Sequence, residues 1–341
     1  MKIKSPRILV IAGPTASGKS DLAISLARKF NGEIISADSR QVYRGMDIGT
    51  GKVTKREQRL ARHWLIDIAS PTRQYTVAHF KRDGQKAIRD ILRRGKLPII
   101  CGGTGFWIDA LVYDQSLPDV KPNAVLRKEL SKLSVSELFH RLKKLDPVRA
   151  KAIDRHNPVR LIRALEIVLT TGKPVPPLVE GHLLQSRYSV LYLALTPSRS
   201  TLLRRITKRL DARLRGGMVA EVQRLHASGA RPVRGGSASN GVSWKRLESF
   251  GLEYRWVARY LQMKNDKLIM KNRKRSSLHS SLGITHLSLR AMRNALLADI
   301  IAYSKRQLTW WKRNKDIHWI QMKSNTFKFI SSIIDTSILK R

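Results

Sequence analysis

The sequence predicts an α/β fold, in which helices flank a parallel β-sheet and an all-helical domain is inserted into the chain. Over about residues 7–101, short apolar runs alternate with longer segments of helical periodicity, which is the pattern of a parallel sheet with crossover helices. From about residue 117 the strand signal stops, and it returns only at residues 188–195. We therefore expect a discontinuous core domain of residues 1–116 and 186–341, and a helical insertion of residues 117–185.

The first half of the core contains buried strands that each end in a polar or glycine-rich segment. The expected strands are residues 7–12, 33–37 and 97–101, and the expected helices are residues 19–30 and 77–94. Ligands of parallel sheets gather at the carboxyl ends of the strands. We therefore expect the loop after the first strand, Asp38 after the second and residues 102–104 after the third to share one crevice.

The insertion has helical periodicity interrupted by proline. Its expected helices are residues 124–133, 135–145 and 160–169, with breaks at Asp146-Pro147 and Asn157-Pro158. After the returning strand, one long helix is expected to run to about Leu225. Residues 230–241, rich in Gly, Ser and Arg, are expected to form a loop or mobile segment, and the basic residues 264–281 are expected to be solvated and flexible.

The composition limits the function classes. The 341 residues include 66 Lys and Arg against 25 Asp and Glu, for a net charge of +41, which favours a polyanionic partner such as nucleic acid. No apolar run approaches the ~18 residues of a membrane span, and the first strand leaves no room for a signal peptide, so we expect no membrane contact and a cytoplasmic location. Cys101 is the only cysteine, which excludes an internal disulfide and a Cys-rich zinc site.

The most specific local motif is a glycine-rich loop between the first strand and the first helix. It has the pattern G-x-x-x-x-G-K-S and comprises Gly13, Pro14, Thr15, Ala16, Ser17, Gly18, Lys19 and Ser20. Its backbone amides and the following helix N-terminus can bind phosphate oxygens, Lys19 can neutralise phosphate charge, and the Ser20 hydroxyl can hold Mg²⁺. The sheet is therefore expected to resemble that of P-loop NTPases, while the phosphate compound stays open.

Several motifs together resemble one family, the tRNA dimethylallyltransferases of the bacterial type. They are the glycine-rich loop and residues 37–50, 63–67, 102–105, 157–166 and 305–310. The loop is shared with many NTPases, whereas Asp-Ser-Arg-Gln at 38–41 and Arg-Gln-x-Thr-Trp at 306–310 are far more specific. The resemblance implies transfer of a dimethylallyl group from dimethylallyl diphosphate to N6 of adenine 37, beside the anticodon of tRNA. In that reaction the loop holds the diphosphate and Mg²⁺ assists.

Asp38 is the candidate general base, because the weakly nucleophilic adenine amino group needs a carboxylate to take its proton. The family's matching aspartate has that role. Two alternatives stay open at this point, a Mg²⁺ ligand and a carboxylate that caps the next helix. The resemblance also places Thr104 in the reaction channel and Arg209 on the diphosphate. Arg213, one turn after Arg209, is a weaker candidate for the same anion.

The resemblance further implies a set of residues that bind the tRNA, whose target base must leave its stack. They are Asp38, Ser39, Arg40, Gln41, Thr104, Arg127, Val159, Arg160, Leu161, Ile162, Arg163, Arg306 and Gln307. Trp310 and Trp311 are expected in the core, with stacking on RNA bases as the alternative, and His63 is interpreted as structural.

Three other functions remain as alternatives. A P-loop kinase of small metabolites would bind ATP in the loop, but such enzymes commonly carry an acid after an apolar strand, and residues 99–101 run into glycine. An adenylate isopentenyltransferase would prenylate AMP or a related nucleotide, which the basic charge and the helical insertion disfavour. A non-enzymatic RNA-binding module would leave Asp38 and the loop without a purpose. We expect a monomer.

Overall fold

The computed structural model describes residues 7–115, 117–176, 186–227, 241–272, 287–321 and 326–336. The chain divides into two compact units, Met1–Asp114 with Gln185–Arg341, and Gln115–Leu184. The predicted insertion, residues 117–185, differs from the second unit by only a few residues. No helix in the described ranges is long and apolar enough to cross a membrane.

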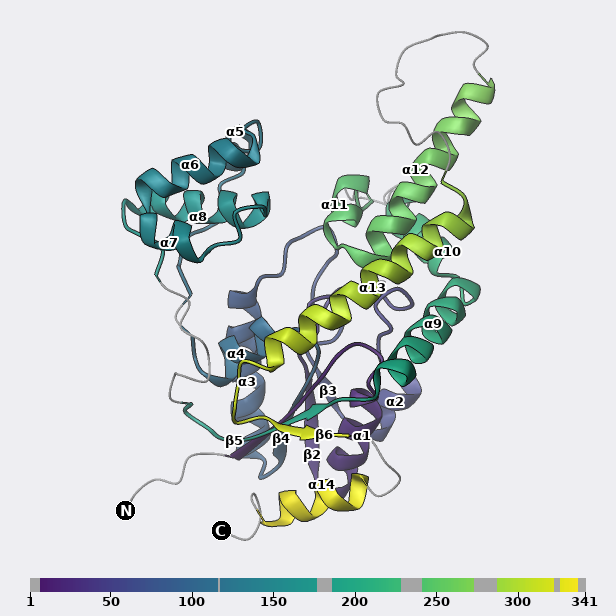
Figure 1. The fold of residues 1–341 in the computed structure, drawn as a ribbon. Helices are drawn as coiled ribbons and strands as arrows, with labels where there is room; N and C mark the ends of the chain where they lie inside the picture. The colour runs from purple at the N-terminus through teal and green to yellow at the C-terminus, as the bar shows by residue number, and fades with distance from the viewer. Residues whose placement is uncertain are drawn as a thin grey trace, which may run out of the picture. The chain divides into compact units, whose positions relative to one another are not determined.

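A six-stranded parallel sheet forms the centre of the first unit (Figure 1). Its strands are β1 (Arg7–Ala12), β2 (Gly32–Ser36), β3 (His63–Trp64), β4 (Leu97–Cys101), β5 (Ser189–Leu195) and β6 (His318–Ile320), in the order β3-β2-β4-β1-β5-β6. The predicted α/β class and the parallel sheet are confirmed. The sequence did not indicate β3 and β6, because two or three half-exposed residues carry no periodic signal.

The register of the sheet aligns the strand ends that matter for function. Ile11 of β1 and Ser36 of β2 both pair with Cys101 of β4, so these three strands end at one level. The loops that follow them therefore start side by side, although the sequence separates them by many residues.

Helices surround the sheet. In the first unit they are α1 (Lys19–Lys29), α2 (Lys55–Leu60), α3 (Val77–Arg93), α4 (Gly105–Val112), α9 (Arg199–Arg215), α10 (Met218–Ala227), α11 (Trp244–Ser249), α12 (Leu252–Asn272), α13 (Leu289–Trp311) and α14 (Thr326–Ile334). On one face of the sheet, Leu22 and Leu26 of α1 and Ile330 of α14 pack with strand residues in a common apolar core. Helix α3 packs against β2 and β4 from the other face (Figure 1).

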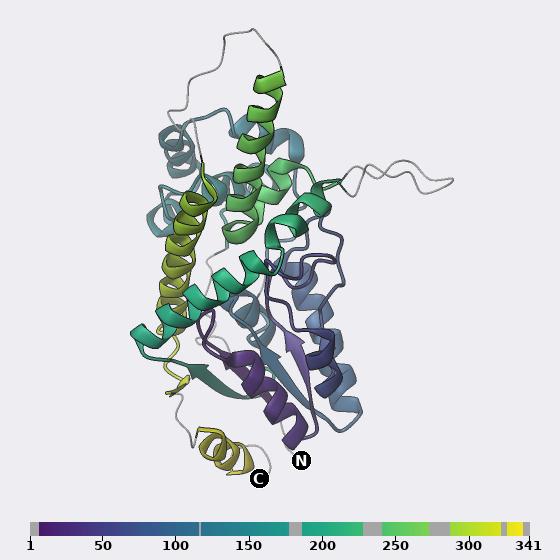
Figure 2. The same ribbon diagram turned by 90° about the vertical axis from the view of Figure 1, so that its right-hand side faces the viewer.

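Helix α13 connects distant parts of the first unit. It packs against α12, α9 and α4, and Figure 2 shows it running beside α12 and across α9. Residues from the last quarter of the chain thereby come close to the loop that follows β1.

Two sequence predictions about this region were wrong. The long helix expected up to Leu225 is two helices, because Gly216 and Gly217 separate α9 from α10 and Gly217 has a φ of 95°, which a residue with a side chain rarely adopts. The flexible segment expected from residue 264 is helical as far as Asn272, the end of α12. Residues 273–281 and 230–240 of these two expected segments lie outside the described residues.

The second unit consists of helices α5 (Ala124–Leu130), α6 (Val135–Leu145), α7 (Pro147–Ala152) and α8 (Pro158–Thr171). Asp146 and Asn157 cap α7 and α8, and a proline follows each cap at the first helical position, which explains the two breaks. Buried Leu138, Leu142 and Leu161 form part of its own apolar core. The helical character expected for this segment is confirmed in the described residues.

Candidate active site

A cavity opens at the carboxyl edge of the sheet, and the three predicted segments meet there. Its lining includes Thr15, Lys19, Ser20, Asp38, Gln41, Gly102, Gly103, Arg209, Tyr303 and Gln307. The convergence expected from the order of the strands is therefore confirmed. Helices α9 and α13 contribute the last three of these residues, which no argument from strand ends could place.

The glycine-rich loop has the geometry of an anion site. Ala16 and Gly18 have φ angles of 63° and 93°, in the left-handed region, and such turns direct successive amides toward one point. Gly18 is the N-cap of α1, and no side chain caps this helix. The first amides of α1 are therefore available to a ligand, and the helix dipole favours a negative one.

Two half-buried cations lie beside this loop. The Lys19 ammonium donates to the Pro14 carbonyl at 2.7 Å, and Arg209 donates to the Thr15 hydroxyl. Burial lowers the pKa of Lys19 to about 8, and the charge of Arg209 acts in the same direction. Burial and the neighbouring Arg213 lower the pKa of Arg209. An anion bound between Lys19 and Arg209 would offset both their desolvation and the repulsion from neighbouring cations. The site therefore favours a negatively charged ligand.

Neighbouring arginines of α9 have different partners. Arg213 donates to the Gly49 carbonyl at 3.1 Å and pairs with Glu253 at 2.8 Å, so its charge is already matched. Arg213 therefore has less uncompensated charge to offer an anion than a cation without such a partner. Arg205 donates to the Ser17 carbonyl at 3.4 Å and was missed, although its spacing of four residues from Arg209 places both on one helix face.

Asp38 follows β2 and borders the cavity. One oxygen, Oδ1, accepts the Arg40 amide at 2.8 Å. The alternative that Asp38 caps a helix is wrong, because the next helix begins only at Lys55. The carboxylate instead fixes a turn through Oδ1, and no hydrogen bond within the described part of the chain uses Oδ2.

Thr104 holds the end of β4 to the end of β2. Its hydroxyl accepts the Ser39 amide at 3.2 Å, and its own amide donates to the Ala37 carbonyl at 3.3 Å. The approach is so close that a Cβ on Gly102 would lie 2.1 Å from the Ala37 oxygen. Glycine is therefore required there by a backbone contact, and Thr104 fixes the position of Asp38.

Helix α13 supplies two further lining residues. The side chain of Tyr303, which sequence reasoning missed, contacts Thr104, and burial raises its pKa to about 12, with the charge of Asp38 acting in the same direction. Gln307 was predicted to bind tRNA. Instead, its Oε1 accepts the Thr15 amide at 2.9 Å and its Nε2 donates to the Gly103 carbonyl at 2.8 Å. Gln307 thus connects the two glycine-rich loops. Its spacing of four residues from Tyr303 places both side chains on one face of the helix, which was the sequence signal that could have identified Tyr303.

The predicted RNA-binding residues after Asp38 are partly internal. Gln41 accepts a hydrogen bond from the Ser36 hydroxyl at 3.1 Å and donates to the Gly51 carbonyl at 3.3 Å. It therefore connects two other lining residues and stabilises the wall of the cavity. The Arg40 guanidinium lies over the Phe250 ring at 5.6 Å, and burial lowers its pKa. Arg306 is exposed on α13.

In the second unit, the predicted residues have different exposures. Arg127 and Arg163 both pair with the fully buried Glu166. The side chain of Leu161 is completely buried in the apolar core of this unit, so the prediction that it contacts RNA is wrong for that side chain. Ile162 packs partly against the same core, whereas Val159 and Arg160 are exposed.

The expected core position is confirmed for Trp311, whereas Trp310 is only half-buried. Trp311 is buried, and Trp310 donates its indole proton to Asp109 at 2.8 Å. A hydrogen bond joins His63 Nδ1 to the Ala61 carbonyl at 2.8 Å, and the ring also borders the cavity, a position that sequence reasoning missed.

Comparison with known proteins gives a consistent result. The family model described as IPP transferase matches residues 41–314, and the one described as isopentenyl transferase matches residues 6–73. The tRNA dimethylallyltransferase of Anoxybacillus flavithermus is 35% identical over 320 residues, which is 94% of this chain and 92% of that protein.

Two solved structures are also similar. The tRNA isopentenylpyrophosphate transferase of Staphylococcus epidermidis has a TM-score of 0.62 and 34% identity, with 97% of this chain and 99% of that one covered. A eukaryotic dimethylallyltransferase acting on tRNA has a TM-score of 0.68 and 25% identity, with 98% and 77% covered.

Proposed function

The chain belongs to the IPP transferase family, and we propose that it transfers a dimethylallyl group from dimethylallyl diphosphate to N6 of adenine 37 of tRNA, with release of diphosphate. The observation that carries the proposal is the pairing, in one cavity, of an anion site with a single carboxylate: Lys19 and Arg209 border the cavity beside Asp38. An anion site alone would suit many phosphate compounds. A base beside it suits transfer to a weak nucleophile.

In the proposed complex, the diphosphate lies on the amides of the glycine-rich loop. The Lys19 ammonium and the Arg209 guanidinium match its charge, which grows on the leaving oxygen as the allylic C–O bond breaks. Because hydrogen bonds to the loop already hold both cations in place, little reorganisation is needed when that charge develops.

The reaction balances without any oxidant. The N6 nitrogen forms a bond to C1 of the dimethylallyl group, and the electron pair of the C1–O bond leaves with the diphosphate. The proton lost from N6 passes to Asp38. Since Oδ1 accepts the Arg40 amide, we assign proton acceptance to Oδ2. Thr104 maintains this geometry through its bond to the Ser39 amide.

Mg²⁺ is part of the proposal. Within the described ranges, no three His, Cys, Asp or Glu side chains could jointly hold a metal ion. In phosphate-binding sites Mg²⁺ is usually held by one or two protein ligands together with substrate phosphates and water. Ser20 lines the cavity, and no hydrogen bond joins its hydroxyl to another described residue, so it is the protein ligand we assign. When bound, Mg²⁺ would supply further neutralisation of the diphosphate.

The RNA substrate is supported by the net charge of +41 and by exposed Arg160 and Arg306. Within the second unit, the exposed Val159 and the partly exposed Arg127 and Arg163 accompany Arg160 in the proposed RNA-binding set. A cytoplasmic location and a monomeric state, as expected from the sequence, complete the proposal.

The test is a transfer assay with labelled dimethylallyl diphosphate and Mg²⁺. We expect label on a tRNA with adenine at position 37 and none on the same tRNA with guanine there. Labelling of free AMP at an equal rate would refute the tRNA acceptor. Phosphate transfer from ATP at a substantial rate, without prenyl transfer, would favour the kinase instead.

A further inference from the structure

One side of the cavity is formed by residues 46–53, here called the wall segment. Thr50, Gly51 and Val53 of this segment line the cavity. The segment is a turn without regular secondary structure, closed internally by bonds from the Thr50 hydroxyl to the Met46 carbonyl at 2.7 Å and from the Lys52 amide to the Asp47 carbonyl at 3.0 Å. These internal bonds shape the turn, but they do not attach it to the rest of the unit.

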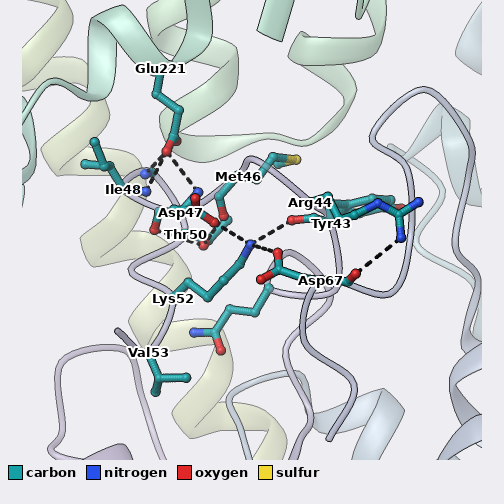
Figure 3. A network of polar contacts seen from close by, with 12 residues as sticks. Tyr43, Arg44, Met46, Asp47, Ile48, Thr50, Lys52, Val53, Asp67 and Glu221 are labelled. Carbon is teal, nitrogen blue, oxygen red and sulfur yellow. Dashed lines mark hydrogen bonds and ion pairs between the residues drawn. The ribbon is translucent and has the colours of Figure 1, made fainter. Parts of the chain in front are cut away.

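A buried carboxylate from α10 makes that attachment. Glu221 is 3% exposed, and its Oε2 accepts the amides of Asp47 at 2.9 Å and Ile48 at 2.7 Å. Its Oε1 accepts the Gly49 amide at 3.0 Å and the Tyr254 hydroxyl at 2.7 Å. Figure 3 shows Glu221 reaching the three successive amides. A carboxylate has about four acceptor positions, so these donors use it fully.

Two other contacts hold the same turn. Arg213 donates to the Gly49 carbonyl at 3.1 Å, so Gly49 is bound through both its amide and its carbonyl. The Lys52 ammonium, whose side chain is 4% exposed, bonds to Asp47 at 2.6 Å and Asp67 at 2.5 Å (Figure 3). Lys52 thus connects the turn to the loop after β3, while Glu221 connects it to the helices.

We propose that Glu221 is a positioning residue for the prenyl donor, an inference that rests on the proposed function. By holding the turn, it sets where Gly51 and Val53 stand in the cavity. Val53 is one of three aliphatic lining residues with Ala23 and Ile34, the kind of surface that receives the hydrocarbon part of an allylic diphosphate. Glu221 itself does not line the cavity, so it acts on the donor through the wall segment.

The chemistry requires a carboxylate rather than an amide at this position. All four partners of Glu221 are donors. In Glu221→Gln, the NH₂ group would face at least one amide or hydroxyl proton, and no rotation of the side chain would restore four acceptor positions. The substitution keeps the size of the side chain and removes only its capacity to hold the turn.

The matched control is Glu33→Gln. Glu33 is also buried, at 1% exposure, and accepts from Arg94, Lys96 and Trp64, but it lies at the start of β2, at the opposite end of that strand from Asp38. Both variants lose bonds to a buried carboxylate, whereas only Glu221→Gln releases the wall segment.

The experiment measures transfer to tRNA with dimethylallyl diphosphate and with the longer geranyl diphosphate, together with the melting temperature. For Glu221→Gln we expect KM for dimethylallyl diphosphate to rise roughly tenfold, kcat to change less than about threefold, and relative use of geranyl diphosphate to increase severalfold. Glu33→Gln should lower the melting temperature and leave KM and donor preference unchanged.

Four results separate the possibilities. Unchanged KM and preference in Glu221→Gln, with active wild type, would overturn the inference, and so would equal shifts in both variants. A wild type inactive with dimethylallyl diphosphate would instead overturn the proposed function. If Glu221→Gln does not fold, Tyr254→Phe removes one of the four donors and should raise KM in the same direction by a smaller factor. No change in that variant would also overturn the inference.

Discussion

Raising the pH from 7 to 9 should weaken binding of a diphosphate to this protein, because Lys19 loses its proton in the free state. Burial lowers the pKa of Lys19 from 10.5 to about 8, so at pH 9 the free protein holds this ammonium only in a minority of molecules. A bound diphosphate favours the charged form and raises the pKa again. Binding above pH 8 must therefore take up a proton.

The magnitude follows from proton linkage. If the bound diphosphate restores the pKa of Lys19 to its ordinary value, binding takes up about 0.1 proton at pH 7 and about 0.9 proton at pH 9. The affinity should then fall about tenfold between these two pH values, which corresponds to about 1.4 kcal/mol. The last pKa of a phosphate ester lies at about 6, so the charge of an ester diphosphate changes only slightly over this range.

The assay is calorimetric titration with a non-reactive thio analogue of dimethylallyl diphosphate. Buffers of different ionisation enthalpy report the number of protons taken up. Lys19→Arg is the matched control, because arginine stays charged throughout and its profile should be flat whatever its absolute affinity. A wild-type affinity that is constant from pH 7 to 9, with no proton uptake, would refute the assignment of Lys19 to the anion.

Three further predictions follow from the described contacts. Asp38→Asn should reduce single-turnover transfer by about 10²–10⁴-fold with diphosphate affinity retained, and near-normal turnover would exclude Asp38 as the base. Gln307→Ala leaves the Thr15 amide and the Gly103 carbonyl without this partner, and should lower the free energy of unfolding by about 1–3 kcal/mol in denaturant titrations. Leu161→Ala should lower the unfolding free energy of the helical insertion by about 2–5 kcal/mol, and a loss below 0.5 kcal/mol would contradict its placement in that core.

Much of the site could be predicted from local sequence patterns. The loop at residues 13–20 requires left-handed backbone at defined positions and a lysine at the start of a helix. Neighbouring residues of the sequence meet both requirements, so the motif can be recognised locally. Asp38 and Gly102 follow apolar strands directly, so the parallel arrangement brought them to the same edge. Periodicity likewise indicated the helical insertion and the breaks at its two prolines.

The residues that were missed or misassigned depend on contacts between distant parts of the chain. Gln307 has the donors expected of an RNA-binding residue, yet both ends of its amide serve the two glycine-rich loops. Tyr303 and Glu221 lie in ordinary helical sequence and reach the cavity or its wall only because α13 and α10 cross that edge. No pattern within a helix reveals which loop its buried side will meet.

The sequence by itself determined the class of the fold, the anion site and the position of Asp38, because each rests on backbone preferences and periodicity within a few neighbouring residues. Only the tertiary structure decided which charges are buried together and which polar side chains are already bonded. Burial lowers the pKa of Lys19, and Glu221 is saturated by donors from three successive amides and a tyrosine. Desolvation and hydrogen-bond satisfaction depend on every group that packs around a side chain, and those groups come from throughout the chain.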